Sequence, residues 1–299
     1  MKHLLSIEAM DAASIETILE NAGVMKAQRG DSQHQPLAGQ TWAMIFAKSS
    51  TRTRVSFEVG IRELGGSVMF LSANDLQLGR GEPLKDTARV LGRMVHGAVI
   101  RTFAQSDVEE FAEHSGIPTI NALTDAEHPC QIITDIFTYQ EMRGPIAGKV
   151  VTYIGDGACN VPISWIWAAA KLDFQLRIAA PQTHQPDADL IAKAGGNITV
   201  TEDCNAAAEG ADLLYTDVWV SMGMETETAQ REQDFANYQI NEPLIKRANK
   251  NALVMHCLPA YRGKEIDEQT LETHANTIFT QAENRLHTQK AILARLAGF

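Results

Sequence analysis

The length and composition of the chain already limit what it can be. Hydrophobic residues make up 44% and charged residues 21% of its 299 residues, which is typical of a globular protein and excludes a disordered or fibrous one. The formal net charge of −11 argues against a nucleic-acid partner and an anionic membrane surface, because both favour a basic protein. Taken in bulk, the same charge also disfavours a small anionic substrate.

The cysteine content and the hydropathy pattern indicate a compartment. Four cysteines in a chain of this length are too few for a disulfide framework. No charged-then-apolar leader opens the chain, and apolar runs such as Ile163 to Ala170 fall well short of the ~20 residues that span a bilayer. We therefore expect a soluble, cytoplasmic protein.

In chain order, short β-branched or aromatic runs alternate with longer helix-like stretches. This alternation predicts an α/β fold made of βαβ units around parallel sheets. The expected strands are Thr41–Phe46, Ser67–Leu71, Ala98–Thr102, Thr119–Ala122, Val150–Ile154, Leu176–Ala180, Asn197–Val200, Leu213–Thr216, Leu253–Met255 and Thr277–Thr280. The expected helices include Val55–Leu64, Leu84–Met94, Val108–Glu113, Gln131–Met142, Ile163–Leu172 and Asp187–Ala194.

A helix stop followed by a turn, at Arg143-Gly144-Pro145-Ile146-Ala147-Gly148, marks the expected domain boundary. It separates the first four expected strands from the last six. We therefore predict two domains, residues 1–140 and 145–284, each a mainly parallel sheet flanked by helices. The last helix, from about residue 285 to 299, can return to the first domain.

Most of the unusual polar clusters follow the C-terminal end of an expected strand. In open α/β sheets, ligands bind outside the carboxyl ends of the strands, so this pattern predicts an enzyme site. The clusters lie at residues 48–54, 101–102, 128–131, 155–160, 217, 256–259 and 283–285.

Residues 50–54, Ser-Thr-Arg-Thr-Arg, begin a helix directly after a strand. Helix-start N–H groups and the positive end of the helix dipole favour an anion, and the hydroxyl and arginine side chains add donors suited to phosphate. The alternative is a Ser/Thr N-cap followed by a solvated basic turn. The density of donors favours phosphate binding.

Other clusters have structural as well as functional interpretations. Arg101 closes an apolar strand, where it either forms a salt bridge or reaches a ligand. His128, beside a proline at a helix start, is either a structural histidine or a ligand-binding one. The segment from Asp217 to Glu225 mixes polar and apolar residues, which suits either a surface loop or a lid over a substrate.

Gly155-Asp156-Gly157 resembles the start of a dinucleotide fingerprint. Asn160 stands in place of the third glycine, and the following strand ends without the acidic residue that would hold a ribose. A nicotinamide cofactor is therefore not expected.

His128, Cys130, His256 and Cys257 include residue types that bind zinc. However, His256 and Cys257 are adjacent at a strand end, where successive side chains point to opposite faces, and no C-x-x-C or H-x-x-x-H spacing occurs. We expect no metal. Cys257 is also a candidate covalent nucleophile, although the sequence identifies no base for it.

Five motifs occur in a fixed order from about residue 40 to the end of the chain. They are Ser-Thr-Arg-Thr-Arg at 50–54, His-Pro-Cys-Gln at 128–131, Asp-x-x-x-Ser-Met-Gly at 217–223, His-Cys-Leu-Pro at 256–259 and Glu-Asn-Arg at 283–285. Together they resemble the aspartate/ornithine transcarbamylase family, in particular its ornithine-specific members. The segment Glu82 to Leu91 also looks like the family's stretch after its loop to the neighbouring subunit.

The resemblance implies two α/β domains with the active site in the cleft between them. It implies a homotrimer or an assembly of trimers, in which each site is completed by a residue of the adjacent chain, here Gln77. No metal or organic cofactor is implied. The implied setting is arginine biosynthesis, although breakdown would use the same site and the sequence leaves the direction open.

The resemblance also implies a role for each matching residue. Carbamoyl phosphate would be bound through its phosphate by Ser50, Thr51, Arg52 and Thr53, and through its carbamoyl end by Arg101, His128, Gln131 and Arg285. L-Ornithine would be bound by Asn160, Asp217, Ser221, Met222, Cys257 and the carbonyl of Leu258. The catalytic groups would be Arg101, His128, Asp217 and Cys257.

Direct attack of the ornithine side-chain amine on the carbamoyl carbon would place charge on the carbonyl oxygen, which Arg101, His128 and Thr53 would stabilise. Asp217 and Cys257 would position the amine and influence its proton affinity. The intact Asp-x-x-x-Ser-Met-Gly motif favours free L-ornithine over aspartate, putrescine or N-acetylornithine.

Two positions depart from the family pattern. Cys159 stands where members commonly have asparagine, and Ala47 stands where glutamate is frequent. Two competing hypotheses are a cysteine-dependent amidohydrolase that uses Cys257 and a catalytically silent family member that regulates other proteins. The complete set of basic and amine-side residues argues against the silent member.

Overall fold

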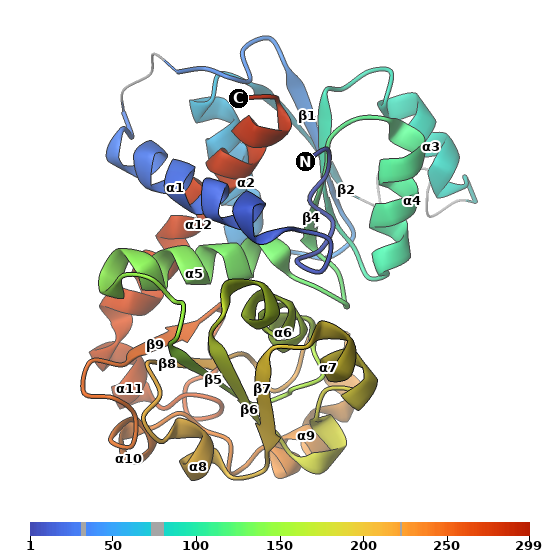
Figure 1. The fold of residues 1–299 in the computed structure, drawn as a ribbon. Coiled ribbons are helices and arrows are strands. Elements are labelled where there is room, and N and C mark those ends of the chain that lie inside the picture. The colour runs from blue at the N-terminus through green and yellow to red at the C-terminus, as the bar shows by residue number, and fades with distance from the viewer. Residues whose placement is uncertain (31–33, 73–80, 222) are drawn as a thin grey trace. The chain divides into compact units, whose positions relative to one another are not determined.

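The computed structural model describes residues 1–30, 34–72, 81–221 and 223–299, which contain two parallel β-sheets with helices packed on their faces (Figure 1). The chain divides into two compact units. Unit 1 comprises residues 1–137 and 283–299, and unit 2 comprises residues 138–282. The α/β class predicted from the sequence is confirmed.

Unit 1 is built on a four-stranded parallel sheet in the order β2-β1-β3-β4. Its elements, with two helices that cross a unit boundary, are α1 (Ala12–Ala27), β1 (Thr41–Phe46), α2 (Thr51–Glu63), β2 (Ser67–Ser72), α3 (Leu84–Leu91), β3 (Gly97–Arg101), α4 (Gln105–Ser115), β4 (Thr119–Leu123), α5 (Pro129–Arg143) and α12 (Ala275–Leu296).

The alternation of side chains along β1 divides the core of unit 1 between the two faces of the sheet. Ala43 and Ile45 pack in one cluster with Ala88 of α3 and Phe111 of α4. Trp42, which is also fully buried, points to the opposite face. Figure 1 shows α3 and α4 on one side of this sheet and α1 and α2 on the other.

Unit 2 contains a five-stranded parallel sheet in the order β7-β6-β5-β8-β9. Its elements are β5 (Val150–Ile154), α6 (Asn160–Leu172), β6 (Gln175–Ala179), η3 (Gln182–His184), α7 (Ala188–Ala194), β7 (Asn197–Thr201), α8 (Cys204–Ala208), β8 (Leu213–Thr216), η4 (Glu225–Glu227), α9 (Thr228–Asp234), α10 (Glu242–Ile245), β9 (Leu253–His256) and α11 (Glu268–Thr273).

The predicted strand Thr277–Thr280 is wrong, because these residues belong to α12. Their β-branched side chains suggested a strand. The buried positions from 277 to 285 instead recur at the spacing of three and four residues that one face of a helix buries; they are Thr277, Ile278, Gln281, Asn284 and Arg285. Consequently the last helix starts at Ala275, and the Glu-Asn-Arg motif lies inside it rather than after a strand.

No helix within the described ranges is both long and apolar enough to cross a membrane. None of the four cysteines forms a disulfide, and all four fall in the part of the chain that the structure covers.

Candidate functional site

Both sheets have a point at which the strand order reverses, and several of the predicted site residues lie there. In unit 1 the chain runs outward from β1 to β2 and returns to β3 on the other side of β1, whereas in unit 2 it runs from β5 to β6 and β7 and returns to β8. Loops diverge beyond the carboxyl ends of the two strands at such a point and leave room for a ligand. The residues at this position in unit 1 are 47–50 and 101–102, and those in unit 2 are 155–160 and 217–221.

The N-terminus of α2 forms the first part of the site. Ser50 caps the helix, and its hydroxyl accepts a hydrogen bond from the Thr53 N–H at 3.3 Å. Thr53 is buried, Arg52 is half-buried and Thr51 is exposed. The first N–H groups of a helix have no partner within it, so this turn offers amide donors and a guanidinium to an anion.

Helix α12 brings Arg285 to this turn from 232 positions away in the sequence. Its Nη2 donates to Thr53 Oγ1 at 3.1 Å and its Nη1 donates to Gln131 Oε1 at 2.6 Å. Gly60 allows α12 to lie close to α2, because a Cβ there would lie only 3.2 Å from Lys290 Cγ. Three distant segments of unit 1 are thus joined by one guanidinium.

Arg101 and His128 are the buried basic groups next to this cluster. Arg101 ends β3 and is 8% exposed, and His128 precedes α5 and is 5% exposed. Burial, reinforced by the charges of Arg285 and Arg101, lowers the pKa of His128 well below 6.5. The imidazole is therefore neutral near pH 7 and keeps one N–H donor. A neutral donor among arginines suits a carbonyl oxygen that gains negative charge.

Ala47, one of the two departures from the family pattern, lines a cavity of about 220 Å³ in unit 1. Arg101, Thr102 and Asp107 line the same cavity. The small side chain at position 47 therefore leaves open space beside the Arg101 strand end.

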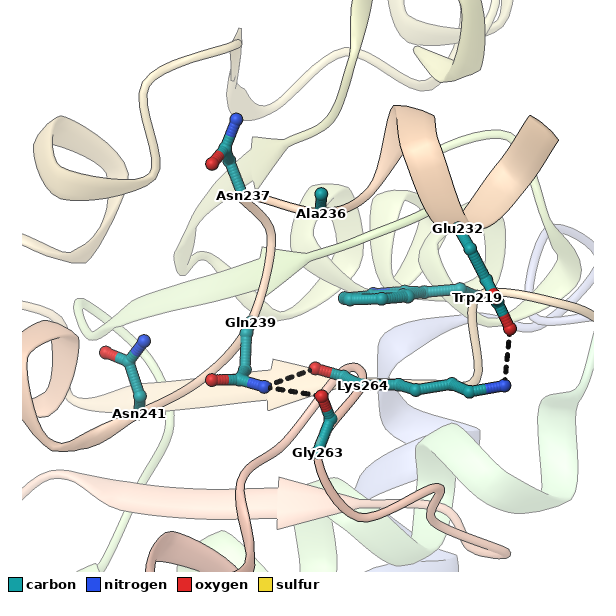
Figure 2. Close-up of a pocket in the computed structure, with 8 residues that line it drawn as sticks. All are labelled: Trp219, Glu232, Ala236, Asn237, Gln239, Asn241, Gly263 and Lys264. Carbon is teal, nitrogen blue, oxygen red and sulfur yellow. Dashed lines mark hydrogen bonds and ion pairs between the residues drawn. The ribbon is translucent and has the colours of Figure 1, made fainter. Parts of the chain in front are cut away.

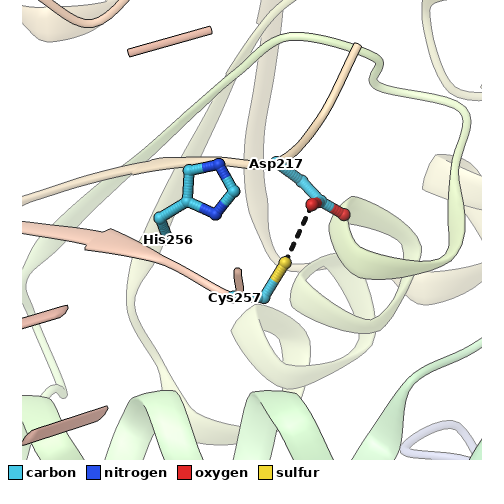
Figure 3. Close-up of side chains that lie close together, drawn as sticks. All are labelled: Asp217, His256 and Cys257. Carbon is cyan, nitrogen blue, oxygen red and sulfur yellow. Dashed lines mark hydrogen bonds between the residues drawn. The ribbon is translucent and has the colours of Figure 1, made fainter. Parts of the chain in front are cut away.

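In unit 2, Asp217 and Cys257 converge beyond the carboxyl ends of β8 and β9 (Figure 3). The Cys257 thiol donates to Asp217 Oδ1 at 2.9 Å, and the Val218 N–H donates to the same oxygen at 2.7 Å. Burial raises the pKa of the Asp217 carboxyl, and the hydrogen bonds from Cys257 and Val218 offset only part of that rise. A carboxylate of raised pKa accepts a proton from an ammonium group more readily than an exposed one.

His256 lies beside this pair, but its ring serves the loop that follows β9. The Leu258 N–H donates to Nδ1 at 2.8 Å, so Nε2 carries the proton and donates to Glu265 Oε1 at 3.1 Å. These bonds hold Leu258 at φ 58°, in the left-handed region that costs a non-glycine residue roughly 1–2 kcal/mol. Because both ring nitrogens are engaged, His256 has no lone pair with which to deprotonate Cys257.

Asp217, His256 and Cys257 each have one atom that could bind a metal ion, and these three atoms lie within 4.8 Å of one another. The expectation that His256 and Cys257 point apart was therefore wrong, because β9 ends at His256 and the alternation of the strand stops there. The engaged ring of His256 still argues against a metal ion at this cluster. His128 and Cys130, the other zinc candidates, belong to unit 1, where burial raises the pKa of Cys130 to about 12.

The remaining amine-side residues lie on neighbouring loops of unit 2. Asn160 is the first residue of α6, and Ser221 lies in the loop after β8. Cys159 occupies the N-cap of α6 without a side-chain capping bond, and its thiol donates to the Asp156 carbonyl at 3.2 Å. Burial raises the pKa of this thiol. Met222 and Gln77 lie outside the described residues.

One buried residue of this region, Arg231 of α9, was missed by the sequence analysis. It is 4% exposed, donates from Nε to the Trp219 carbonyl at 2.6 Å and pairs through Nη2 with the Asp156 carboxylate. The sequence of α9 is polar throughout, which is typical of a solvated helix. The one signal in the sequence was Asp156, which stands between two glycines after an apolar strand. An acid that is buried at such a position requires a cationic partner, and Arg231 is that partner.

A cavity of about 480 Å³ also lies in unit 2, with Trp219 in its wall (Figure 2). Among the polar side chains that line it, Lys264 pairs with Glu232 at 2.6 Å, and Gln239 donates to the carbonyls of Gly263 and Lys264. Of the predicted site residues that the structure describes, none is among those that line it.

Comparison with known proteins agrees with the geometry of both units. Residues 2–141 match the model described as the aspartate/ornithine carbamoyltransferase carbamoyl-P binding domain, and residues 147–296 match that of the Asp/Orn binding domain. The ornithine carbamoyltransferase of Akkermansia muciniphila is 55% identical over 300 residues, which cover 99% of this chain and 98% of that protein.

Solved structures give the same result. The anabolic ornithine carbamoyltransferase of Campylobacter jejuni superposes with a TM-score of 0.92 at 41% identity, over 99% of each chain. The ornithine carbamoyltransferase of Pyrococcus furiosus superposes with a TM-score of 0.91 at 42% identity, over 98% of this chain and 96% of that one. The chain therefore belongs to the aspartate/ornithine carbamoyltransferase family.

Proposed function

We propose that the protein transfers the carbamoyl group of carbamoyl phosphate to the side-chain amine of L-ornithine and releases L-citrulline and phosphate. The observation that carries the proposal is the junction of Thr53, Gln131 and Arg285 at the start of α2. A cationic fork held between a hydroxyl and an amide, next to free helix amides, suits a ligand with both a phosphate and a carbonyl group.

Carbamoyl phosphate binds to unit 1 in this proposal. Ser50, Thr51, Arg52 and Thr53 hold the phosphate with helix amides, hydroxyls and a guanidinium. Arg101, His128, Gln131 and Arg285 bind the carbamoyl end. Gln77 of an adjacent copy completes the site, in a homotrimer or an assembly of trimers.

L-Ornithine binds to unit 2. Asp217, Cys257 and the Leu258 carbonyl surround the reacting amine, while Asn160, Ser221 and Met222 hold the remainder of the substrate. The raised pKa of Asp217 equips it to accept a proton from the ammonium group, since only the neutral amine is a nucleophile.

The transfer is a direct displacement. The amine nitrogen forms a bond to the carbamoyl carbon, the bond from that carbon to the oxygen that bridges it to phosphorus breaks, and phosphate leaves with the electron pair. Of the two protons that the ammonium group loses, one is carried away on hydrogen phosphate and one is released to water. Arg101 and His128 stabilise the charge that develops on the carbonyl oxygen. The reaction requires no metal ion, organic cofactor or covalent enzyme intermediate.

The domain roles follow from this assignment. Residues 1–140, with the end of α12, form the carbamoyl phosphate domain, and residues 145–284 form the ornithine domain. Four cysteines without a disulfide fit a reducing compartment, so we place the enzyme in the cytoplasm, with a role in arginine biosynthesis.

Steady-state kinetics of the purified protein test the proposal. Carbamoyl phosphate and L-ornithine should give citrulline and phosphate in equal amounts, with the sequential pattern of a ternary complex. Aspartate, putrescine and N-acetylornithine should be poor acceptors. A preference for one of these three, or ping-pong kinetics with a carbamoylated Cys257, would contradict the proposal.

A further inference from the structure

Two loops of unit 2 contain, or lead directly into, three of the six residues that the proposed function assigns to ornithine. The acceptor loop, residues 217–221, contains Asp217 and Ser221. The β5–α6 loop, residues 155–159, leads directly into Asn160. The paired strands β5 and β8 fix where the two loops begin, but beyond the strand ends neither loop belongs to a regular element.

The guanidinium of Arg231 contacts both loops. Its Nε donates to the Trp219 carbonyl at 2.6 Å, midway between Asp217 and Ser221 in the acceptor loop. Its Nη2 pairs with the carboxylate of Asp156 in the β5–α6 loop. Both side chains of this pair are 5% exposed. A guanidinium presents donors in a rigid plane, so it can bind a carbonyl and a carboxylate at a fixed angle, which a lysine ammonium cannot do.

Each partner of Arg231 is also anchored within its own loop. The second carboxylate oxygen of Asp156 accepts the Ala158 N–H at 3.0 Å, which shapes the turn before α6. The Trp219 ring stacks on the Phe235 ring with 6.2 Å between centroids, and the Arg231 guanidinium lies 5.4 Å from the centre of the Phe235 ring. A displacement of Arg231 would therefore move the backbone of both loops rather than side chains alone.

The burial of this ion pair indicates a positional rather than a stabilising role. Taking two charges out of water is costly, and a buried pair often contributes little more to stability than a well-packed apolar pair would. A buried pair does impose one geometry, because neither charge tolerates the loss of its partner. The Arg231–Asp156 pair fixes the position of the acceptor loop relative to the β5–α6 loop, and in the proposed function both loops serve the same substrate.

We propose that Arg231 is a positioning residue for the amine substrate: it joins the acceptor loop to the β5–α6 loop and thereby fixes Asp217 and Ser221 relative to Asn160. The inference rests on the proposed function for the identity of the substrate. It assigns Arg231 no contact with ornithine.

Glu227, the N-cap residue of α9 four positions before Arg231, provides a matched control. Its carboxylate lies 3.4 Å from Arg231 Nη1, but its side chain is 58% exposed and it belongs to neither loop. Glu227→Gln removes an ion pair of Arg231 and leaves the contact between the loops intact. Asp156→Asn keeps an oxygen for the Ala158 N–H and removes the charge that Arg231 faces. Arg231→Lys keeps the charge and removes the planar fork.

The test is the kinetics of these three variants beside the parent protein. For Asp156→Asn and Arg231→Lys we expect the KM for ornithine to rise about tenfold, while the KM for carbamoyl phosphate stays within about twofold. The double variant should be no worse than the worse single variant, because one contact is lost in either case. Glu227→Gln should behave as the parent does. An unchanged KM for ornithine in both variants, or an equal rise in both KM values, would overturn the inference.

Hydrogen exchange separates this inference from the proposed function. In Asp156→Asn and Arg231→Lys the amides of residues 217–221 should lose protection, whereas those of β9 should not. This result is expected even if the parent protein fails to form citrulline, an outcome that would refute the proposed function alone. Equal exchange at residues 217–221 in parent and variants would refute the positioning role, whatever the activity of the parent.

Discussion

Replacement of Arg285 by methionine is the most informative single change in unit 1. It keeps much of the aliphatic volume and removes two hydrogen bonds from a charged donor, to Gln131 at 2.6 Å and to Thr53 at 3.1 Å. At about 1.5–3 kcal/mol for each such bond the gross loss is about 3–6 kcal/mol, and relief of the buried charge offsets part of it. We expect a net loss of about 2–4 kcal/mol and a fall in melting temperature on the order of 10 °C.

The effect of Arg285→Met on activity should exceed the effect on folding. If Arg285 binds the carbamoyl end, kcat/KM for carbamoyl phosphate should fall about 100- to 1000-fold in the folded fraction. The pKa of His128 should rise toward 6.5, because Arg285 is one of the charges that lower it, and an NMR titration of the imidazole reports this directly. Lys26→Met, which removes a 2.8 Å bond to the neighbouring Asn284, is the matched control. A folded Arg285→Met variant with parental kcat/KM would refute the assignment.

Three further changes test other features. Because the pKa of His128 is lowered in the folded state, its contribution to stability is complete above pH 6.5 and declines below that value by about 1.4 kcal/mol per pH unit until the folded pKa is reached. In urea unfolding between pH 6.5 and 5, His128→Asn should therefore lose less free energy of unfolding than the parent protein. Parallel curves for the two proteins would contradict this. Cys159→Ser should raise the free energy of unfolding by about 0.5–1 kcal/mol by supplying the missing cap of α6, and a decrease in the urea midpoint would speak against it. Gly157→Ala should lower the free energy of unfolding by about 1–3 kcal/mol and weaken ornithine binding, because its Cβ would lie 2.9 Å from Ile178 Cγ2 and 3.0 Å from the His184 carbonyl oxygen. Calorimetry that finds the variant as stable as the parent would refute the steric argument.

The strands that the sequence could predict are those that parallel sheets bury on both faces. Thr41–Phe46 and Leu213–Thr216 are short apolar runs bounded by turns, and both are strands in the structure. Thr277–Thr280 has similar composition but belongs to a helix, because its burial pattern is set by the packing of α12. Local β-propensity carries no information about this packing, so it could not distinguish the helix from a strand.

The site shows the same division between local and distant information. The helix start at Ser50 follows from adjacent residues, as does the position of Asp217 at a strand end. The bond from Arg285 to Thr53 joins segments 232 residues apart, so no local pattern contains it. Net charge was a poor guide for the same reason: a chain of net charge −11 still places Arg101 and Arg285 together in a buried cluster.

The division of unit 1 into two stretches of chain has a consequence for biosynthesis. Unit 2 is one continuous segment, residues 138–282, so all of its residues are synthesised in one uninterrupted stretch. Unit 1 lacks residues 283–299 until the ribosome has finished them. Thr53 and Gln131 are therefore synthesised long before Arg285, and the proposed carbamoyl phosphate site cannot assemble until all of unit 2 has been translated. A chain truncated before residue 283 would contain every residue of unit 2 and a donor site without its arginine.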